Sequence, residues 1–530
     1  MSRCALLLLL ASAFFGCGHS THRSTVGRAY YVDCSASQNG AGTQSHPWNT
    51  LTSLASIAFQ SGDQLLFRRG TSCDGLLAPQ GSGSSAVPIV IDAYGSGAPP
   101  IINGGMNEEA LKLFNQQYWE IRNLEIVGGN RYGVFISGDR PNSSLNHIVL
   151  RDLNAHGAAF HSKLRSDSGE VVIATTALKE VLNDVLVDRV TAHDTTASQG
   201  ISISAGGSWT GNWGAPQTLG NNITVQNSTA YNVGGDGILI SEATNGLLQH
   251  NVVHHTGLCA SCTGSTPNGL WEWYCHKCTV QFNESYANKS WLKNDGGDFD
   301  IDYYDDDNIV QYNYGHDSAG YCISVFGSDG SPSRNNIVRY NICSNDGQSR
   351  AGAFQGEIFL HTWNGGSLDG VQIYNNTLYW NPAVNAPAFN TEGVTYAGSG
   401  QKIFMNNVIF STVAGMIHTS SDFQLDHNIY WTTEASKPSF QIGKRVYSSF
   451  ASYQAASHQD SHSRFTNPCL TDPTYHSAGP PASAFILLAG SPALGAGADV
   501  CAAIADCTMG ARDFFGAPLR DGAPRDIGAN

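Results

Sequence analysis

The sequence predicts an all-β solenoid, in which short parallel strands stack coil upon coil, and three observations support this prediction. A five-residue phrase recurs and ends each time in asparagine, as in Ile-Val-Gln-Tyr-Asn at 309–313 and Ile-Val-Arg-Tyr-Asn at 337–341. The intervals between these asparagines are uneven, which excludes rigid helical repeats but suits β-coils whose loops vary in length. Glycine fills 58 positions and charged residues make up only 13% of the chain, a composition typical of turns rather than long helices.

The asparagine that closes the phrase can be followed from coil to coil through Asn227, Asn251, Asn283, Asn313, Asn341, Asn376, Asn407 and Asn428. In parallel coils, side-chain amides can stack at the strand spacing of about 4.8 Å, each donating to the next carbonyl. Because buried amides are normally satisfied by structure, we interpret this ladder as scaffold and not as a site.

The N-terminal residues predict export. Residues 1–17 begin with Arg3, continue through an apolar run and end at Gly16-Cys17, which is too short to span a bilayer. Gly16-Cys17 also resembles the end of a bacterial lipoprotein signal, so a lipid anchor at Cys17 and cleavage after Ala13 are both open. The protein is therefore expected outside the cytoplasm, in the medium, the periplasm or at the cell surface.

Beyond a polar linker at 18–28, one elongated domain is expected. The β-helix with its N-terminal cap is predicted over 29–434, and an irregular C-terminal cap or tail over 435–530, where Ala, Ser, Gly and Pro dominate. Apolar residues at helical spacing in 51–58 predict an amphipathic helix that covers the first coil. Strands are expected at 63–69, 89–94, 101–102, 119–126, 147–153 and 184–190, with further coils to about 431.

These features, together with four short landmarks, resemble exported right-handed parallel β-helix proteins of the pectin-lyase-like superfamily. The landmarks are Tyr-Tyr-Val-Asp at 30–33, Pro-Trp at 47–48, Gly-Asp at 62–63 and Asp-Ile-Gly at 526–528. The resemblance covers about residues 29–530 and implies a right-handed coil and a carbohydrate-active protein. It does not select an activity, because this architecture hosts lyases, hydrolases, epimerases, esterases and adhesins.

Acidic residues gather on one predicted strand. Counting back from Asn283 and Asn313 aligns 268–272 with 298–302, which brings Glu272 beside Asp302 on adjacent coils. Strand alternation would then place apolar residues inside and carboxylates outside.

Neighbouring carboxylates separate their proton affinities, so one can act as an acid while the other stays ionised, as hydrolysis of a glycosidic bond requires. We therefore predict a glycoside hydrolase that degrades a polysaccharide and needs no cofactor. Its predicted catalytic residues are Glu272, Asp298, Asp300 and Asp302.

Two alternatives stay open. Seven carboxylates between 295 and 307 suit calcium, with Asp295 and Asp305 as candidate ligands. A calcium-dependent lyase acting on a uronate polymer would then use Lys289 or Lys293 as the base. The second alternative is a non-catalytic carbohydrate-binding or adhesive surface protein, which would bind sugars with the aromatic residues near this strand but would not cleave them.

Aromatic side chains near this strand could pack against sugar rings. Trp271 is expected in the core, because the predicted register gives it the inward column of Ile301. The candidate substrate-binding residues are Trp291, Tyr304, Trp363, His316, Lys293 and Glu357.

The cysteines suit an exported protein. Cys34 with Cys73 and Cys322 with Cys343 are predicted disulfides between neighbouring coils. Four others, Cys259, Cys262, Cys275 and Cys278, have the spacing of a four-thiolate zinc site, but export favours disulfides over zinc.

The net charge of -15 provides no basic surface for nucleic acid. A polysaccharide is the expected partner, membrane contact is expected only through a lipid anchor, and the protein is expected to be a monomer.

Overall fold

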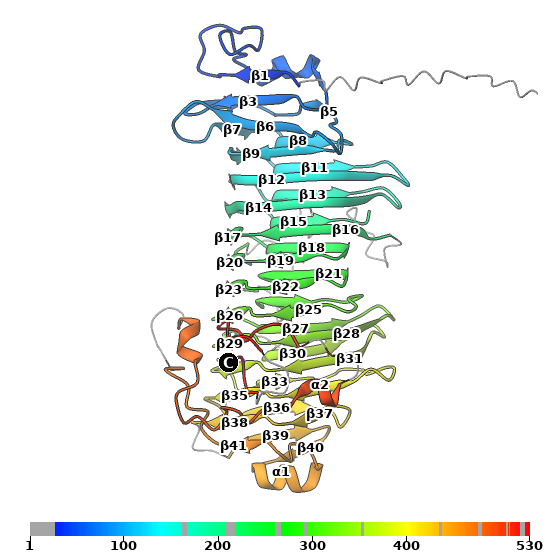
Figure 1. Cartoon of the computed structure of the whole chain (residues 1–530), viewed down its shortest axis with the longest axis vertical. Coiled ribbons are helices and arrows are strands. Elements are labelled where there is room, and N and C mark those ends of the chain that lie inside the picture. The colour runs from blue at the N-terminus through cyan, green and yellow to red at the C-terminus, as the bar shows by residue number, and fades with distance from the viewer. Residues whose placement is uncertain are drawn as a thin grey trace, which may run out of the picture.

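The structure is a computed structural model that describes residues 27–161, 167–207, 218–259, 267–290, 294–350, 355–433, 437–474, 480–504, 507, 509–519 and 525–530. Short strands stack in parallel along one long axis, as Figure 1 shows, so the predicted all-β parallel β-helix is confirmed. Each coil contributes strands to three sheets that run the length of the molecule. The predicted signal peptide lies outside the described residues.

The first sheet carries the outer face on which the candidate site is built. Its strands are β8 (Glu109–Phe114), β11 (Tyr132–Gly138), β13 (Gly169–Thr175), β15 (Gln199–Ser204), β18 (Asp236–Thr244), β21 (Leu270–His276), β24 (Phe299–Ile301), β27 (Tyr321–Gly327), β30 (Gly356–Thr362), β33 (Phe389–Asn390), β36 (Gly415–Thr419) and β39 (Ser439–Ile442).

The second sheet lies before the asparagine ladder in each coil. Its strands are β1 (Ala29–Val32), β3 (Gln64–Arg68), β6 (Ile89–Tyr94), β9 (Trp119–Arg122), β12 (Ser144–His156), β14 (Val181–Thr195), β16 (Gly220–Gln226), β19 (Leu247–Gln249), β22 (Thr279–Gln281), β25 (Ile309–Gln311), β28 (Pro332–Arg339), β31 (Ser367–Tyr374), β34 (Lys402–Met405) and β37 (Gln424–Asp426).

The third sheet follows the ladder, and the long strands β12 and β14 turn the corner into it. Its other strands are β4 (Ser72–Asp74), β7 (Ile101–Gly105), β10 (Glu125–Gly128), β17 (Thr229–Val233), β20 (Val252–His254), β23 (Glu284–Tyr286), β26 (Tyr314–His316), β29 (Ile342–Ser344), β32 (Thr377–Trp380), β35 (Val408–Ser411), β38 (Ile429–Thr432) and β41 (Arg464–Phe465). Two short strands, β2 (Ala58–Phe59) and β5 (Gln80–Gly81), form a separate parallel pair.

The predicted asparagine ladder runs through the interior corner between the second and third sheets. From Asn251 to Asn407, each backbone N–H donates to the side-chain Oδ1 of the next ladder asparagine at 2.9–3.0 Å, and each side-chain amide donates to that same oxygen. The ladder ends where Asn428 N–H donates to the hydroxyl of Ser463.

The sequence predicted that the ladder begins at Asn227, and this prediction is wrong by one residue. Asn227 is exposed and donates to Asp188, while the N–H of Ser228 donates to Asn251 Oδ1. The chain therefore enters the ladder corner at Ser228, and the asparagine before it lies on the outside of the turn.

Both ends of the solenoid are covered. The predicted N-terminal helix is a short 3-10 helix, η1 (Leu51–Ser56), whose Leu51 and Leu54 are buried. The coils continue beyond the predicted boundary at 434, because β39 and β41 still pair in parallel without the asparagine phrase. The short strand β40 (Arg445–Tyr447) pairs antiparallel with β39, and α1 (Phe450–Ser457) closes the end of the stack (Figure 1).

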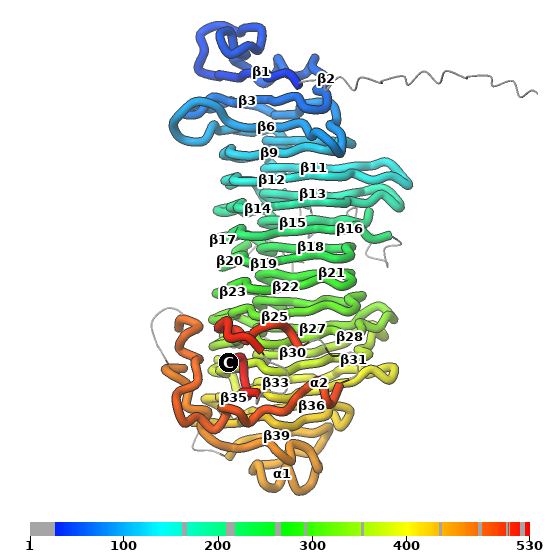
Figure 2. Tube along the Cα trace, in the orientation of Figure 1, coloured from blue at the N-terminus to red at the C-terminus, as the bar shows by residue number. Residues whose placement is uncertain are grey.

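The C-terminal tail then runs back along the outside of the coils, as Figure 2 shows. It contains η2 (Ala482–Phe485) and α2 (Val500–Ala503) and packs on aromatic residues of the third sheet and of the ladder corner. Phe485, for example, packs beside Tyr314 and Tyr379. No helix in the described ranges is long and apolar enough to cross a membrane.

Replacing Asn313 by Ala should destabilise the coils around it. The N–H and the side-chain amide of Asn283 both donate to Asn313 Oδ1 at 3.0 Å, so the substitution leaves two buried donors without an acceptor. A loss of about 1–3 kcal/mol is expected for each donor. Urea denaturation would measure the loss in the free energy of unfolding. The control is Asn385→Ala, which alters an exposed asparagine. Equal midpoints for both variants would contradict a ladder that stabilises the fold.

Candidate active site

The register between β21 and β24 decides which acidic side chains share a face. Leu270 pairs with Phe299, Trp271 with Asp300, and Glu272 with Ile301. The sequence alignment predicted Glu272 beside Asp302, one residue out of register, because the connection from β24 to the ladder is one residue longer than that from β21. A shift of one residue turns every side chain of a strand to the opposite face.

Glu272 is therefore not an outer-face carboxylate, so the placement on which its predicted catalytic role rested is wrong. Its side chain points into the solenoid, in the column of Ile240 and Ile301, and is 0% exposed. Burial raises the pKa of Glu272 to about 8. Trp271 was also placed on the wrong face: it lies in the outward column with Asp300, although its own side chain is buried.

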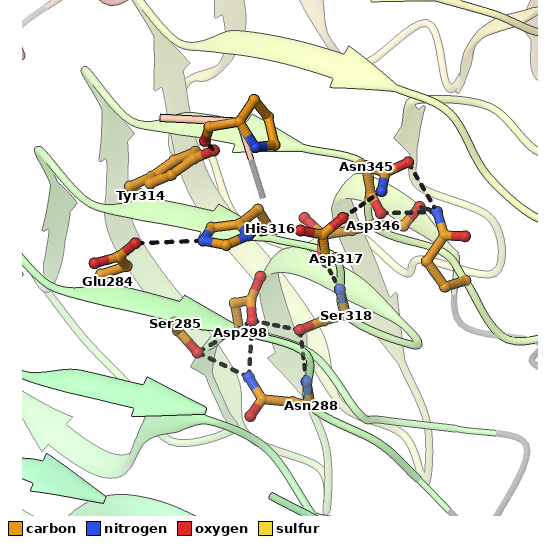
Figure 3. A network of polar contacts seen from close by, with 12 residues as sticks. Glu284, Ser285, Asn288, Asp298, Tyr314, His316, Asp317, Ser318, Asn345 and Asp346 are labelled. Carbon is orange, nitrogen blue, oxygen red and sulfur yellow. Dashed lines mark hydrogen bonds and ion pairs between the residues drawn. The ribbon is translucent and has the colours of Figure 1, made fainter. Parts of the chain in front are cut away.

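Asp298 does not lie on the outer face either, although the sequence predicted it there. It precedes β24 and turns into the opposite interior corner, where Figure 3 shows it between Ser285, Asn288 and Ser318. Its Oδ1 accepts hydrogen bonds from all three side chains at 2.6–3.1 Å. Burial and the nearby Asp346 raise the pKa of Asp298 well above its ordinary value.

Asp300 and Asp302 do face outward from β24, as predicted. Asp300 Oδ2 accepts from Asn268 Nδ2 at 2.8 Å, and its Oδ1 accepts from the hydroxyl of Ser324 at 2.5 Å. Asp302 accepts from the backbone N–H of Tyr303 at 3.0 Å. These bonds fix the orientation of both carboxylates at the base of the outer face.

A third carboxylate, Asp295, joins them through Tyr321. The phenol oxygen of Tyr321 lies 3.1 Å from Asp295 Oδ1 and 3.1 Å from Asn268 Oδ1. Burial, followed by the charges of Asp300 and Asp295, raises the pKa of Tyr321 well above its ordinary value, so its O–H stays a donor. We call Asp295, Asp300 and Asp302 the carboxylate cluster.

Gly297 creates the seat for this phenol. A β-carbon at position 297 would come within 2.2 Å of the Tyr321 ring, so only glycine lets the ring lie against the backbone there. The sequence prediction missed Tyr321, Asn268 and Ser324 as site residues. Only the glycine pair at 296–297, directly before the acidic strand, signalled a close approach in the sequence.

Aromatic rings border the cluster. Trp273 and Tyr303 make an edge contact with centroids 5.8 Å apart, Tyr303 meets Trp363 at 5.8 Å, and Trp363 meets Phe326 at 5.4 Å. The predicted platform residue Tyr304 also contacts Tyr303, at 5.2 Å, but is only 8% exposed. Tyr303 and Trp363 are half-buried, so their rings present part of their surface to a ligand.

The remaining members of the acidic run do not converge on one cation. Asp305 lies in the interior, where it accepts from the N–H of Cys275, and Asp306 pairs with Arg334. Among the described residues, Asp295 and Asp305 share no group of three or more mutually close metal-ligating atoms. The candidate residues Trp291, Lys293 and Cys262 lie outside the described residues.

Some of the described cysteines are disulfide-bonded and others are free thiols. Cys259 is disulfide-bonded, whereas Cys275 and Cys278 are free thiols, which excludes the predicted four-thiolate site and a second disulfide-bonded pair. The predicted Cys34–Cys73 and Cys322–Cys343 disulfides are present, and Cys501–Cys507 is a third.

His316 and Glu357 do not belong to the outer face of the first sheet, so their predicted substrate contacts are not supported. His316 lies on the third sheet, stacked between Tyr286 and Tyr314 at 4.7 and 4.5 Å. Glu357 is 0% exposed and accepts from the N–H of Asp346 at the interior corner.

Comparisons with known proteins give distant carbohydrate-active relatives. No protein-family model matches the chain. A lacto-N-biosidase from Bifidobacterium longum subsp. longum is 23% identical over 77% of this chain, and this chain spans only 30% of that protein. A GH136 lacto-N-biosidase structure from Eubacterium ramulus has 19% identity and a TM-score of 0.49, covering 76% of this chain and 64% of its own. Pectate lyase Pel9A has 13% identity and a TM-score of 0.44, covering 96% of both chains.

Protonated His316 should stabilise the fold near neutral pH. Burial alone would lower its pKa, but hydrogen bonds to Asp317 and Glu284 outweigh burial and raise the pKa to about 9 (Figure 3). Because the pKa is raised, this stabilisation is complete below about pH 6.5 and is lost as pH rises through about 9.

The free energies of unfolding of wild type and His316→Gln, measured by urea denaturation, should therefore differ by roughly 3 kcal/mol at about pH 6 and converge at about pH 10. His46→Gln, at an exposed histidine, should show no such convergence. A His316→Gln difference that stays constant with pH would contradict the raised pKa.

Proposed function

We propose that this protein is an exported glycoside hydrolase whose reaction is carried by Asp295, Asp300 and Asp302. The observation that supports this proposal is the meeting of three carboxylates around one buried phenol on the outer face of the first sheet, beside aromatic rings. The described part of the C-terminal tail packs on the other two sheets.

The proposed chemistry divides between the carboxylates according to their surroundings. Asp300 is held on both oxygens by Asn268 and Ser324, so we assign it a positioning and electrostatic role beside the reacting carbon. Asp302 directly follows β24, two residues beyond Asp300 and next to Tyr303. We assign Asp302 the role of nucleophile or base.

Asp295 is the candidate acid. It is half-buried, more open than Asp300 and Asp302, and its Oδ1 faces the Tyr321 hydroxyl. A carboxyl group at the rim of the cluster can give its proton to the leaving oxygen and recover one from solvent. Tyr321 would keep Asp295 oriented toward the other two carboxylates.

Tyr303 and Trp363 are the proposed sugar platforms. Sugar rings present apolar C–H faces that pack on aromatic rings, and polar rims that suit carboxylate and amide groups. The two side chains contact each other next to Asp302, so a sugar packed on them would place its neighbouring bond over the cluster.

The similarity to a lacto-N-biosidase supports hydrolysis over elimination. Because this chain spans less than a third of that relative, we propose only the substrate class, an oligosaccharide or polysaccharide. The three described disulfides support an exported enzyme that works in an oxidising compartment.

Asp295→Asn, Asp300→Asn and Asp302→Asn should each lower kcat by about 10²- to 10⁴-fold, because each removes a group that transfers a proton, attacks or stabilises charge. The control is Asp307→Asn, an exposed member of the same acidic run, which should retain the wild-type rate. Thermal midpoints should stay close to wild type in all four.

Adding azide to Asp302→Ala and Asp295→Ala would assign the roles, because a small anion can replace a missing carboxylate and is trapped as a glycosyl azide. Unchanged rates in all three asparagine variants would remove the carboxylate cluster from the mechanism.

A product assay separates hydrolysis from elimination. The protein should release new reducing ends from a panel of neutral and uronate-containing glycans, lacto-N-biosides included, without ultraviolet absorbance from an unsaturated sugar. Activity should not require added calcium, because the proposed chemistry uses carboxylates alone. Unsaturated product that disappears with chelator would replace this proposal with a calcium-dependent lyase, and binding without any product would replace it with a carbohydrate-binding protein.

A further inference from the structure

The interior corner at the end of β21 holds two free thiols, Cys275 and Cys278, in a protein that also contains disulfides. Cys275 and Cys278 are buried and free, whereas Cys34, Cys73, Cys322, Cys343, Cys501 and Cys507 are joined in disulfides. Of the free cysteines in the described residues, only Cys469 lies away from this corner, and it is partly exposed. A buried C-x2-C pair that stays reduced beside so many disulfides indicates a use for both sulfurs.

Glu272 points into the same corner without a polar partner. Both of its carboxylate oxygens are buried and accept no hydrogen bond, and the side chain is 0% exposed. One of its oxygens and the sulfurs of Cys275 and Cys278 all lie within 4.8 Å of one another. A buried carboxyl group with neither oxygen satisfied is costly, so this arrangement requires an occupant or a proton.

Asp305 adds a fourth group from the next coil. Its Oδ1 accepts from the N–H of Cys275, and its Oδ2 is buried without a partner. This bond holds the Asp305 carboxylate next to Cys275, although its oxygens lie outside the group of atoms within 4.8 Å of one another that Glu272 and the two sulfurs form. Two sulfurs and the Glu272 carboxylate therefore converge in an apolar interior, with the Asp305 carboxylate beside them on the next coil.

We propose that Cys275, Cys278, Glu272 and Asp305 bind one zinc ion inside the β-helix. Two thiolates and two carboxylate oxygens are the ligand number and type of a closed tetrahedral zinc site. Sulfurs bound to zinc at about 2.3 Å lie about 3.8 Å apart, so Cys275, Cys278 and Glu272 need only a small contraction, and Asp305 completes the site by moving toward them. The closed site has a structural role, since no position is left for water or substrate.

A disulfide between Cys275 and Cys278 explains less. It would satisfy the two sulfurs but leave the oxygens of Glu272 and the Oδ2 of Asp305 unpaired in the apolar interior. Zinc satisfies all four groups at once and offsets the charge of the ionised ligands. The site would also anchor the turn directly after Asp302, since Asp305 lies three residues beyond it.

Metal analysis of the intact protein tests this proposal. Protein purified without chelator should contain about one zinc per chain, and exchange into Co²⁺ should give thiolate-to-metal charge-transfer absorption. Alkylation under denaturing conditions, followed by peptide mass spectrometry, should find Cys275 and Cys278 unlinked once zinc is removed.

Variants locate the ion. Cys278→Ser should abolish stoichiometric zinc, Glu272→Gln should weaken its retention against a chelator by at least tenfold, and Cys469→Ser should keep it. If Cys278→Ser does not fold, the Co²⁺ spectrum of the wild type still decides. Unlinked thiols without bound metal, or a Cys275–Cys278 disulfide in the purified protein, would overturn the proposal.

Discussion

The buried asparagine ladder is the constraint on which the rest of the structure depends. Each ladder oxygen accepts two hydrogen bonds from the previous coil, so neighbouring coils can pair in only one register at this corner. The residue before each asparagine is left-handed, even where it is Phe282, Tyr312 or Tyr340, and this strain is offset by the bonds that follow it. Everywhere else the loops are free to change length.

That freedom explains what could be predicted from the sequence and what could not. The ladder from Asn251 to Asn428 follows from spacing, because its geometry is the same in every coil. The face on which Glu272 lies depends on the number of residues between strand and ladder, which changes by one between two coils, whereas Asp298 turns inward because it precedes β24. Residue propensities do not reveal such an insertion, so the sequence placed Glu272 on the wrong face. Asp300 and Asp302 were placed correctly, because strand alternation within one coil does not depend on that distance.

Long-range contacts were also invisible in the sequence. Tyr321 reaches Asn268, 53 residues earlier, and its place in the site rests on the room left by Gly297. The strand β24 is fixed at both ends by buried polar groups, Asp298 in one interior corner and Asp305 in the other. Between them the strand presents Asp300 and Asp302 on a backbone with little room to move, as pre-organised electrostatics requires.

The C-terminal tail changes how the solenoid would come apart. Stacked coils touch only their neighbours, so a bare solenoid can fray from either end. Here Tyr314 bonds the carbonyl of Pro480, 166 residues later, Asn375 bonds that of Asp526, and Thr377 bonds the N–H of Ala529. These bonds tie coils in the C-terminal half of the stack into one cooperative unit that opens only when the tail detaches. Because the tail follows these coils in the chain, this half of the molecule would gain its full resistance to unfolding only after residues 480–530 have been synthesised.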